Sequence, residues 1–157
     1  MAENEAPWRK MAVVTAIAEP ARSQRYILIG ESGDISHPEF GDVLKQGQLQ
    51  QILGGGFEMF RSGKLPGVTL WMNASKAANG TSINAIASVL MERPLYGPIL
   101  FSRTSVRTLG LSEKQLHVLA AELENAGEEC RRLLRSGELD ARCRQIRETD
   151  RARRAGM

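Results

Sequence analysis

The sequence has few of the residues that build disulfide-stapled, metal-bound or membrane-spanning proteins. Its 157 residues include only two cysteines and two histidines, and 5% are aromatic. No stretch approaches the roughly 18 consecutive apolar residues that a membrane-crossing helix needs. Two cysteines in a chain of this size do not form a disulfide framework. The remaining composition, 42% hydrophobic and 25% charged, is that of an ordinary globular domain, for which we expect a cytoplasmic location and no membrane partner.

The scarce metal-ligating residues are Cys130, Cys143, His37 and His117. A structural zinc site usually takes four ligands, and the chain has no Cys-x-x-Cys pair. If both cysteines lay on one continuous helix, their thirteen-residue separation would place them on nearly opposite faces and prevent a bridge. We therefore expect two structural thiols, no metal site and no cofactor.

Catalytic signatures are also missing. Segment 30–33 (Gly-Glu-Ser-Gly) is one residue short of a nucleophile elbow. In segment 62–65 (Ser-Gly-Lys-Leu) a Leu replaces the Ser or Thr that a phosphate-binding loop needs, and Glu58 stands where its first Gly belongs. Because no paired carboxylates accompany the two histidines, we expect a protein that is not an enzyme.

The excess of positive charge is confined to the C-terminal part. Residues 1–127 are neutral, whereas nine arginines and six acidic residues give residues 128–157 the whole net charge of +3. Arginines without an acidic residue four positions before them, including Arg147, Arg151 and Arg153, can follow a phosphate backbone, so nucleic-acid binding is possible. A solvated helix surface is favoured over it, because four acid-before-arginine pairs have helical i, i+4 spacing. These pairs are Glu128/Arg132, Glu138/Arg142, Asp140/Arg144 and Asp150/Arg154.

The first two-thirds of the chain predict a small α+β domain. Segments 12–18 and 25–29 are rich in β-branched residues and are separated by a turn, which predicts two strands. Segment 12–18 follows two basic residues, as in a secretory leader, but its shortness favours a buried strand. The expected order ββαββαβ predicts a small mixed or antiparallel sheet with two helices on one face. After these two strands we expect a helix over Asp42–Leu53, antiparallel strands over Phe57–Phe60 and Val68–Met72, a helix capped by Thr81 or Ser82 and ended by Pro94, and a strand over Leu95–Phe101 with Pro98 at an edge or bulge.

Glycine and asparagine residues near the middle of the chain have two interpretations. Backbone N–H groups at Gly54, Gly55 and Gly56 can bind an anion, and the amides of Asn73 and Asn79 can contact the same small ligand. Turn and helix-cap chemistry is the favoured alternative for both sets. A small-ligand or nucleotide site therefore stays open here.

The last third of the chain is helical. Ser112 and Gln115 form a capping box that starts a helix, and Gly137 interrupts it before a second amphipathic stretch. We expect either a helical hairpin or an extension, with an apolar seam that packs within the chain or against a second copy. The predicted parts are a disordered segment 1–11, an α+β domain 12–108, an amphipathic helix 109–136 and an Arg-rich helical tail 138–157. The seam consists of Leu116, Leu119, Leu123, Ala126, Cys130 and Leu133.

Residues 26–103 contain four motifs in a recognisable order. They resemble a small family of domains of unknown function that recurs in phages, plasmids and actinobacteria. The sequence departs from that pattern at Ala74–Asn79, where the family tends to have an acidic, Gly-Lys turn. The motifs are Leu53-Gly-Gly-Gly-Phe-Glu58, Val68-Thr-Leu-Trp-Met-Asn73, a helix starting near Ser82, and Tyr96-Gly-Pro-Ile-Leu100.

The resemblance implies an accessory protein of a mobile element that acts by binding, for example in host modulation or anti-defence. It implies no activity and no catalytic residues. The first hypothesis is therefore an interaction module that engages a host protein or a second copy of itself in the cytoplasm. A sequestering protein for a nucleotide-like anion and a nucleic-acid-binding protein are the alternatives.

Overall fold

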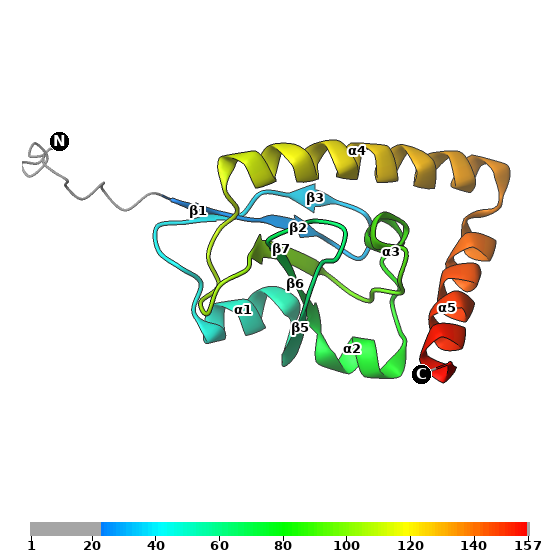
Figure 1. Ribbon diagram of the computed structural model, residues 1–157, viewed down its shortest axis with the longest axis horizontal. Coiled ribbons are helices and arrows are strands. Elements are labelled where there is room, and N and C mark those ends of the chain that lie inside the picture. Colours follow the sequence, from blue (N-terminus) through cyan, green and yellow to red (C-terminus); the bar gives the residue numbers. More distant parts are fainter. Residues whose placement is uncertain (1–22, 157) are drawn as a thin grey trace, which may run out of the picture.

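The computed structural model describes residues 23–156, which form a five-stranded antiparallel sheet with helices around it (Figure 1). The strand order is β3-β2-β7-β6-β5, and the short strands β1 and β4 pair separately. The expected α+β class is confirmed. The strands are β1 Gln24–Arg25, β2 Ile27–Ile29, β3 Ile35–Ser36, β4 Glu39–Phe40, β5 Phe57–Arg61, β6 Val68–Asn73 and β7 Ile99–Arg103; the helices are α1 Gln46–Leu53, α2 Ala74–Asn79, α3 Ala85–Met91, α4 Glu113–Ser136 and α5 Leu139–Ala155.

Helices cover both faces of the sheet, so the expectation of two helices on one face is wrong. Alternation along β6 sends Leu70 to the face covered by α3 and α4, called here the α4 face, and Trp71 to the face covered by α1, the α1 face. The central strands are apolar on both sides and need a cover on each. The α4 face buries Ile27, Ile29, Val68, Leu70, Ile99 and Phe101 with α4 residues Leu119, Leu123 and Ala126; the α1 face buries Tyr26, Leu49, Leu53 and Leu100.

Strand β7 lies in the middle of the sheet, between β2 and β6. Ile99, Leu100 and Phe101 are completely buried there. The sequence predicted that Pro98 marks a sheet edge or a bulge, and this prediction is wrong. Pro98 directly precedes the first residue of the strand, where the missing N–H removes no ladder hydrogen bond.

Helix α3 begins later than expected because its cap is Asn84 and not Thr81 or Ser82. The Asn84 side chain is fully buried, and its oxygen accepts the Ala87 N–H at 3.2 Å. Its amide donates to the carbonyls of Ile29, Gly30 and Gly97 at 2.8–3.2 Å. One side chain thus starts α3 and attaches it to the ends of two strands.

Helix α2 was not expected, and α1 is shorter than expected. Asn73, the last residue of β6, caps α2 by accepting the Lys76 N–H. The backbone N–H of Leu44 donates to the carbonyl of Thr108, and α1 begins after it, at Gln46. The expected strand 25–29 is divided into β1 and β2 at Tyr26. The expected strand 12–18 and segment 1–11 lie outside the described residues.

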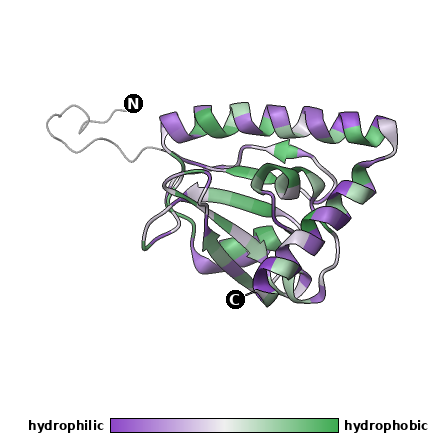
Figure 2. Cartoon of the chain, turned by 45° about the vertical axis from the view of Figure 1, so that its right-hand side comes forward, coloured by the Kyte–Doolittle hydropathy of each residue, from purple (hydrophilic) through white to green (hydrophobic). Residues whose placement is uncertain are grey.

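The C-terminal helices begin and break where the sequence predicts. Ser112 and Gln115 form the reciprocal capping box, with hydrogen bonds of 2.9 and 3.1 Å. Gly137 ends α4 in the left-handed conformation, with φ of 78°. Helix α5 then turns steeply away from α4 instead of folding back along it (Figure 1), and it contacts both α3 and α4. Figure 2 shows that α5 is largely hydrophilic, whereas the sheet strands are mainly hydrophobic.

The apolar seam of α4 is buried within the chain. Leu119 and Leu123 are 1% and 3% exposed, and Leu116 is half-buried against the same core. The seam is thus unavailable for a homodimer interface. Cys130 and Cys143 lie on different helices, so the separation argued for one continuous helix does not apply; both are buried and free. Among residues 23–156, no helix has the length and apolarity to cross a membrane.

Candidate anion-binding site

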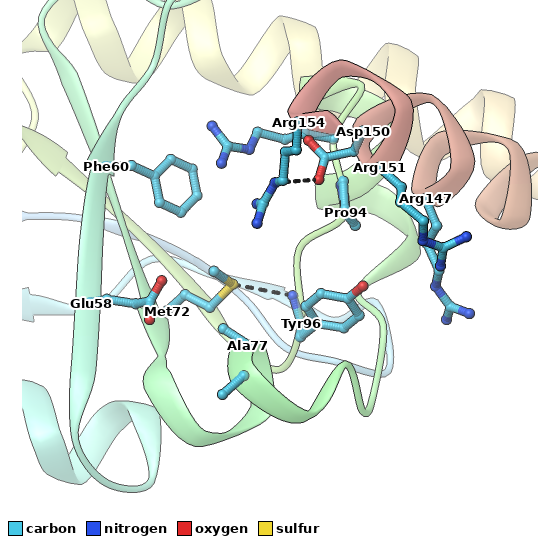
Figure 3. A pocket seen from close by; sticks show the side chains of 12 residues that line it. Glu58, Phe60, Met72, Ala77, Pro94, Tyr96, Arg147, Asp150, Arg151 and Arg154 are labelled. Carbon is cyan, nitrogen blue, oxygen red and sulfur yellow. Dashed lines mark hydrogen bonds and ion pairs between the residues drawn. The ribbon is translucent and has the colours of Figure 1, made fainter. Parts of the chain in front are cut away.

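A cavity of about 430 Å³ lies between α5 and the part of the α4 face that α3 and α4 leave open. Figure 3 shows α5 above this cavity, Phe60 at one side, and Tyr96 and Ala77 below. Segments far apart in the sequence therefore form its walls. The lining residues are Glu58, Phe60, Met72, Ala77, Ala78, Arg93, Pro94, Tyr96, Arg147, Asp150, Arg151 and Arg154.

The floor of the cavity is apolar except for the carboxylate of Glu58. The register of β5 with β6 places Glu58 opposite Met72, so that these residues and Phe60 share one face of the sheet. The backbone N–H of Tyr96 contacts the Met72 sulfur at 3.3 Å, which joins the loop before β7 to the floor. The small side chain of Ala77, on α2, leaves the space above the floor open.

The opposite wall is a row of charged side chains on α5. Arg147, Asp150, Arg151 and Arg154 have the spacing i, i+3, i+4 and i+7, which places them on one face of a helix. Cys143 and Ile146 are buried and therefore face the interior. Their packing holds α5 in place. The row is therefore fixed above the floor by the packing of the same helix.

The carboxylate in this row is already neutralised by its neighbours. Asp150 is 13% exposed, and its two oxygens lie 3.6 Å from Arg153 and 3.0 Å from Arg154. Within residues 23–156, Arg147 and Arg151 form no ion pair. The Nε of Arg147 is buried and has no hydrogen-bond acceptor in that part of the chain.

A fourth arginine reaches the cavity from the loop after α3. The Arg93 guanidinium carbon lies 4.3 Å from the centroid of the Phe60 ring, a cation–π contact. Its Nε is likewise buried, with no acceptor among the described residues. Arg93 and Arg147, which both line the cavity, thus each keep one buried N–H group without an acceptor among the described residues.

The charges around the cavity do not balance. Four arginines line it, against the carboxylates of Asp150 and Glu58, which leaves an excess of two positive charges. Guanidinium groups bind carboxylates and phosphates through paired N–H donors and remain charged at all ordinary pH values. The arrangement is suited to holding an anion.

The three arginines that were predicted to bind nucleic acid have different surroundings in the structure. Arg147 and Arg151 line the cavity, whereas Arg153 pairs with Asp150. Of the four expected i, i+4 pairs, only Asp150/Arg154 forms among the described residues. Arg131 and Arg132 instead pair at i, i+3 with Glu128 and Glu129, and Arg142 donates to Gln145.

The structure brings Gly54 and Asn73 together in a separate hollow that Lys76 also lines, but Asn79 does not line it. Gly54, with φ of 84°, ends α1, and both polar atoms of the buried Asn73 side chain are used, one by Leu53 and one by Lys76. Asn79 is exposed at the far end of α2. Gly54 and Asn73 therefore have cap roles, which was the favoured alternative for them.

The candidate metal ligands do not converge. His37 and His117 are exposed in a separate hollow with Glu39 and Glu113. Within residues 23–156, no group of three or more His, Cys, Asp or Glu side chains is placed to hold a metal ion. Burial, followed by the nearby thiol of Cys143, raises the pKa of Cys130 to about 11, so this thiol is protonated at neutral pH.

The sequence contains a signal for the α5 wall of the cavity but none for the residues opposite it. The helical spacing of Arg147, Asp150, Arg151 and Arg154 is a signal that could have grouped these residues. Nothing in the sequence connects Arg93 or Phe60 with α5. Comparisons with models of known protein families, with curated proteins and with solved structures find no match to this chain.

Proposed function

We propose that this protein is a non-enzymatic binding protein that takes an anionic ligand into the cavity between α5 and the sheet. The observation that carries the proposal is the convergence of four arginines, against two carboxylates, on one cavity. An anion in the cavity can accept charge-assisted hydrogen bonds from the guanidinium groups of Arg151 and Arg154, which are exposed. The excess of positive charge adds a favourable Coulomb term.

Binding, not catalysis, suits the groups that surround the ligand. Arginine does not exchange protons near neutral pH, so these four side chains hold charge but are poor acids or bases. The thiols and imidazoles, which carry out much of protein acid–base and nucleophilic chemistry, lie elsewhere among the described residues. Glu58 is exposed, and Asp150 is held by two arginines.

A small anion is favoured over a nucleic acid because the arginines converge. A phosphate backbone requires cations spread along a surface, whereas Arg93, Arg147, Arg151 and Arg154 border one concave space. The proposal keeps the binding role implied by the family resemblance but moves the ligand from Gly54–Gly56 to α5. It does not depend on self-association, since the α4 seam is buried internally.

Calorimetric titration with inorganic phosphate at low ionic strength tests the proposal. The variant R147Q/R151Q removes two cavity charges and should lower the phosphate affinity at least about tenfold, equivalent to about 1.4 kcal/mol. The matched control is R135Q/R144Q, which removes the same charge at two exposed positions outside the cavity. It should bind phosphate almost as tightly as the unmodified chain.

Two results would overturn the proposal. One is the absence of any phosphate binding or thermal stabilisation at millimolar phosphate, since a bound ligand must stabilise the folded state. The other is an equal loss of affinity in both double variants, which would show that phosphate responds only to the net charge of the chain.

A further inference from the structure

We infer that the anionic ligand is a nucleoside monophosphate, with its phosphate on the arginine wall and its base on the apolar floor. This inference rests on the proposed function and specifies the ligand class of the same cavity. It draws on three features of the site: the size of the charge excess, the apolar side chains of the floor, and the position of Glu58 on β5, across the cavity from α5.

The charge excess matches one phosphate monoester. Four arginines against two carboxylates leave two positive charges at the cavity. A phosphate monoester carries about −1.5 to −2 at pH 7, which compensates that excess. A carboxylate ligand with a single charge would leave half of it uncompensated.

The floor is suited to a flat, weakly polar group and not to a second phosphate. Phe60, Met72 and Ala77 pack against the core of the α4 face or belong to it, and Tyr96 adds an aromatic ring. Nucleobases stack on aromatic side chains in a sequence-tolerant way, because every base has a π-face. Ligand pockets combine apolar walls with a few polar groups, and the volume of about 430 Å³ falls in their usual range of about 300–1,000 Å³.

Glu58 orients the ligand in the cavity. Its exposed side chain lies on β5, on the strand side of the cavity in Figure 3, opposite the arginines of α5. A carboxylate repels phosphate and accepts hydrogen bonds from hydroxyl or amino groups. The phosphate is therefore directed toward Arg147 and Arg151, and the sugar hydroxyls or the amino group of the base toward Glu58.

A series of ligands that share one phosphate tests this assignment. Titrations would use inorganic phosphate, ribose 5-phosphate, the four common nucleoside monophosphates and adenosine. At least one monophosphate should bind about tenfold or more tightly than ribose 5-phosphate, and adenosine should bind more weakly than that monophosphate. If ribose 5-phosphate binds as tightly as all four monophosphates, the base has no site and the inference is overturned, whereas the proposed function stands. If inorganic phosphate also fails to bind, the proposed function is overturned as well.

Substitutions on the floor separate the base from the phosphate. Y96L removes the ring and A77L fills the space above the floor, and each should weaken monophosphate binding at least about fivefold while the affinity for inorganic phosphate stays unchanged. F57L is the matched control, because Phe57 belongs to β5 but packs on Trp71 at the α1 face. Circular dichroism and thermal melts verify that each variant is folded. Retention of full monophosphate affinity by both Y96L and A77L would refute the inference.

Discussion

The side-chain amide of Asn73 donates a 2.9 Å hydrogen bond to the backbone carbonyl of Leu53, the last residue of α1. The oxygen of the same side chain accepts the Lys76 N–H and caps α2. One buried asparagine thus joins the end of one helix to the start of another. Gly54 and Gly55 lie against this amide, since a Cβ at either position would be 3.6 Å from its nitrogen. The Gly–Asn motif is therefore a structural joint.

Replacement of Asn73 by alanine should destabilise the fold without affecting anion binding. It leaves the Leu53 carbonyl and the Lys76 N–H without their partners, and we expect a loss of about 1–3 kcal/mol in the free energy of unfolding. N79A, at an exposed position on α2, should change stability by less than about 0.5 kcal/mol. Chemical denaturation and phosphate titration measure both effects. Loss of phosphate binding in N73A at unchanged stability would return the ligand site to Gly54–Gly56.

The inward seam of α4 predicts a contrast between two leucines of one helix. Leu123 is 3% exposed in the core of the α4 face, whereas Leu134 is 67% exposed. L123A should lower the free energy of unfolding by about 2–5 kcal/mol, because it leaves a cavity in the core. L134A should change it by less than about 0.5 kcal/mol. A concentration-dependent stability that L123A abolishes would instead indicate that the seam lies between two chains.

Deprotonation of the Cys130 thiol should lower the free energy of unfolding at high pH. Its pKa is about 11 in the folded chain against an ordinary value of 9.0, mainly because burial disfavours the thiolate and secondarily because Cys143 lies nearby. The folded state holds this proton more tightly than the unfolded state does. The contribution of this proton to the free energy of unfolding is complete below pH 9 and is lost as the pH rises toward 11.

The variant C130A should therefore lose less stability between pH 8.5 and pH 10.5 than the unmodified chain does. Denaturation with a reducing agent present measures the difference. The same slope in both proteins would show that other groups, such as Tyr26, whose pKa is also raised by burial, account for the alkaline loss.

Two glycines should respond in opposite directions to alanine. A Cβ at Gly110 would lie 2.5 Å from the backbone nitrogen of Arg25, so G110A forces the two segments apart and should cost about 1–3 kcal/mol. Gly47 lies in α1 with open space beside it, since a Cβ there would meet nothing within 4 Å, and G47A should stabilise the chain by about 0.5–1 kcal/mol. Thermal melts decide between the signs, and equal shifts would contradict the close approach at Gly110.

Local signals predicted much of the fold. The capping box at Ser112 and Gln115, the left-handed glycines Gly54 and Gly137, and the alternation of β6 act over a few residues, so the sequence shows them directly. The cap of α3 was misplaced because Asn84 competes with Thr81 and Ser82 for the same role. Only its three carbonyl partners, at the end of β2 and just before β7, make Asn84 the better choice.

The sequence by itself determined the α+β class, the antiparallel β5–β6 pair and the start and interruption of the C-terminal helices, because periodicity and capping depend on near neighbours. The tertiary structure alone decided that β7 lies at the centre, that helices cover both faces, and that the α4 seam is internal. It also decided that the arginines of α5 share a cavity with Arg93 and Phe60. Those outcomes depend on which surfaces meet after the chain has folded, and no local pattern encodes the distance between a helix at residue 147 and a strand at residue 60.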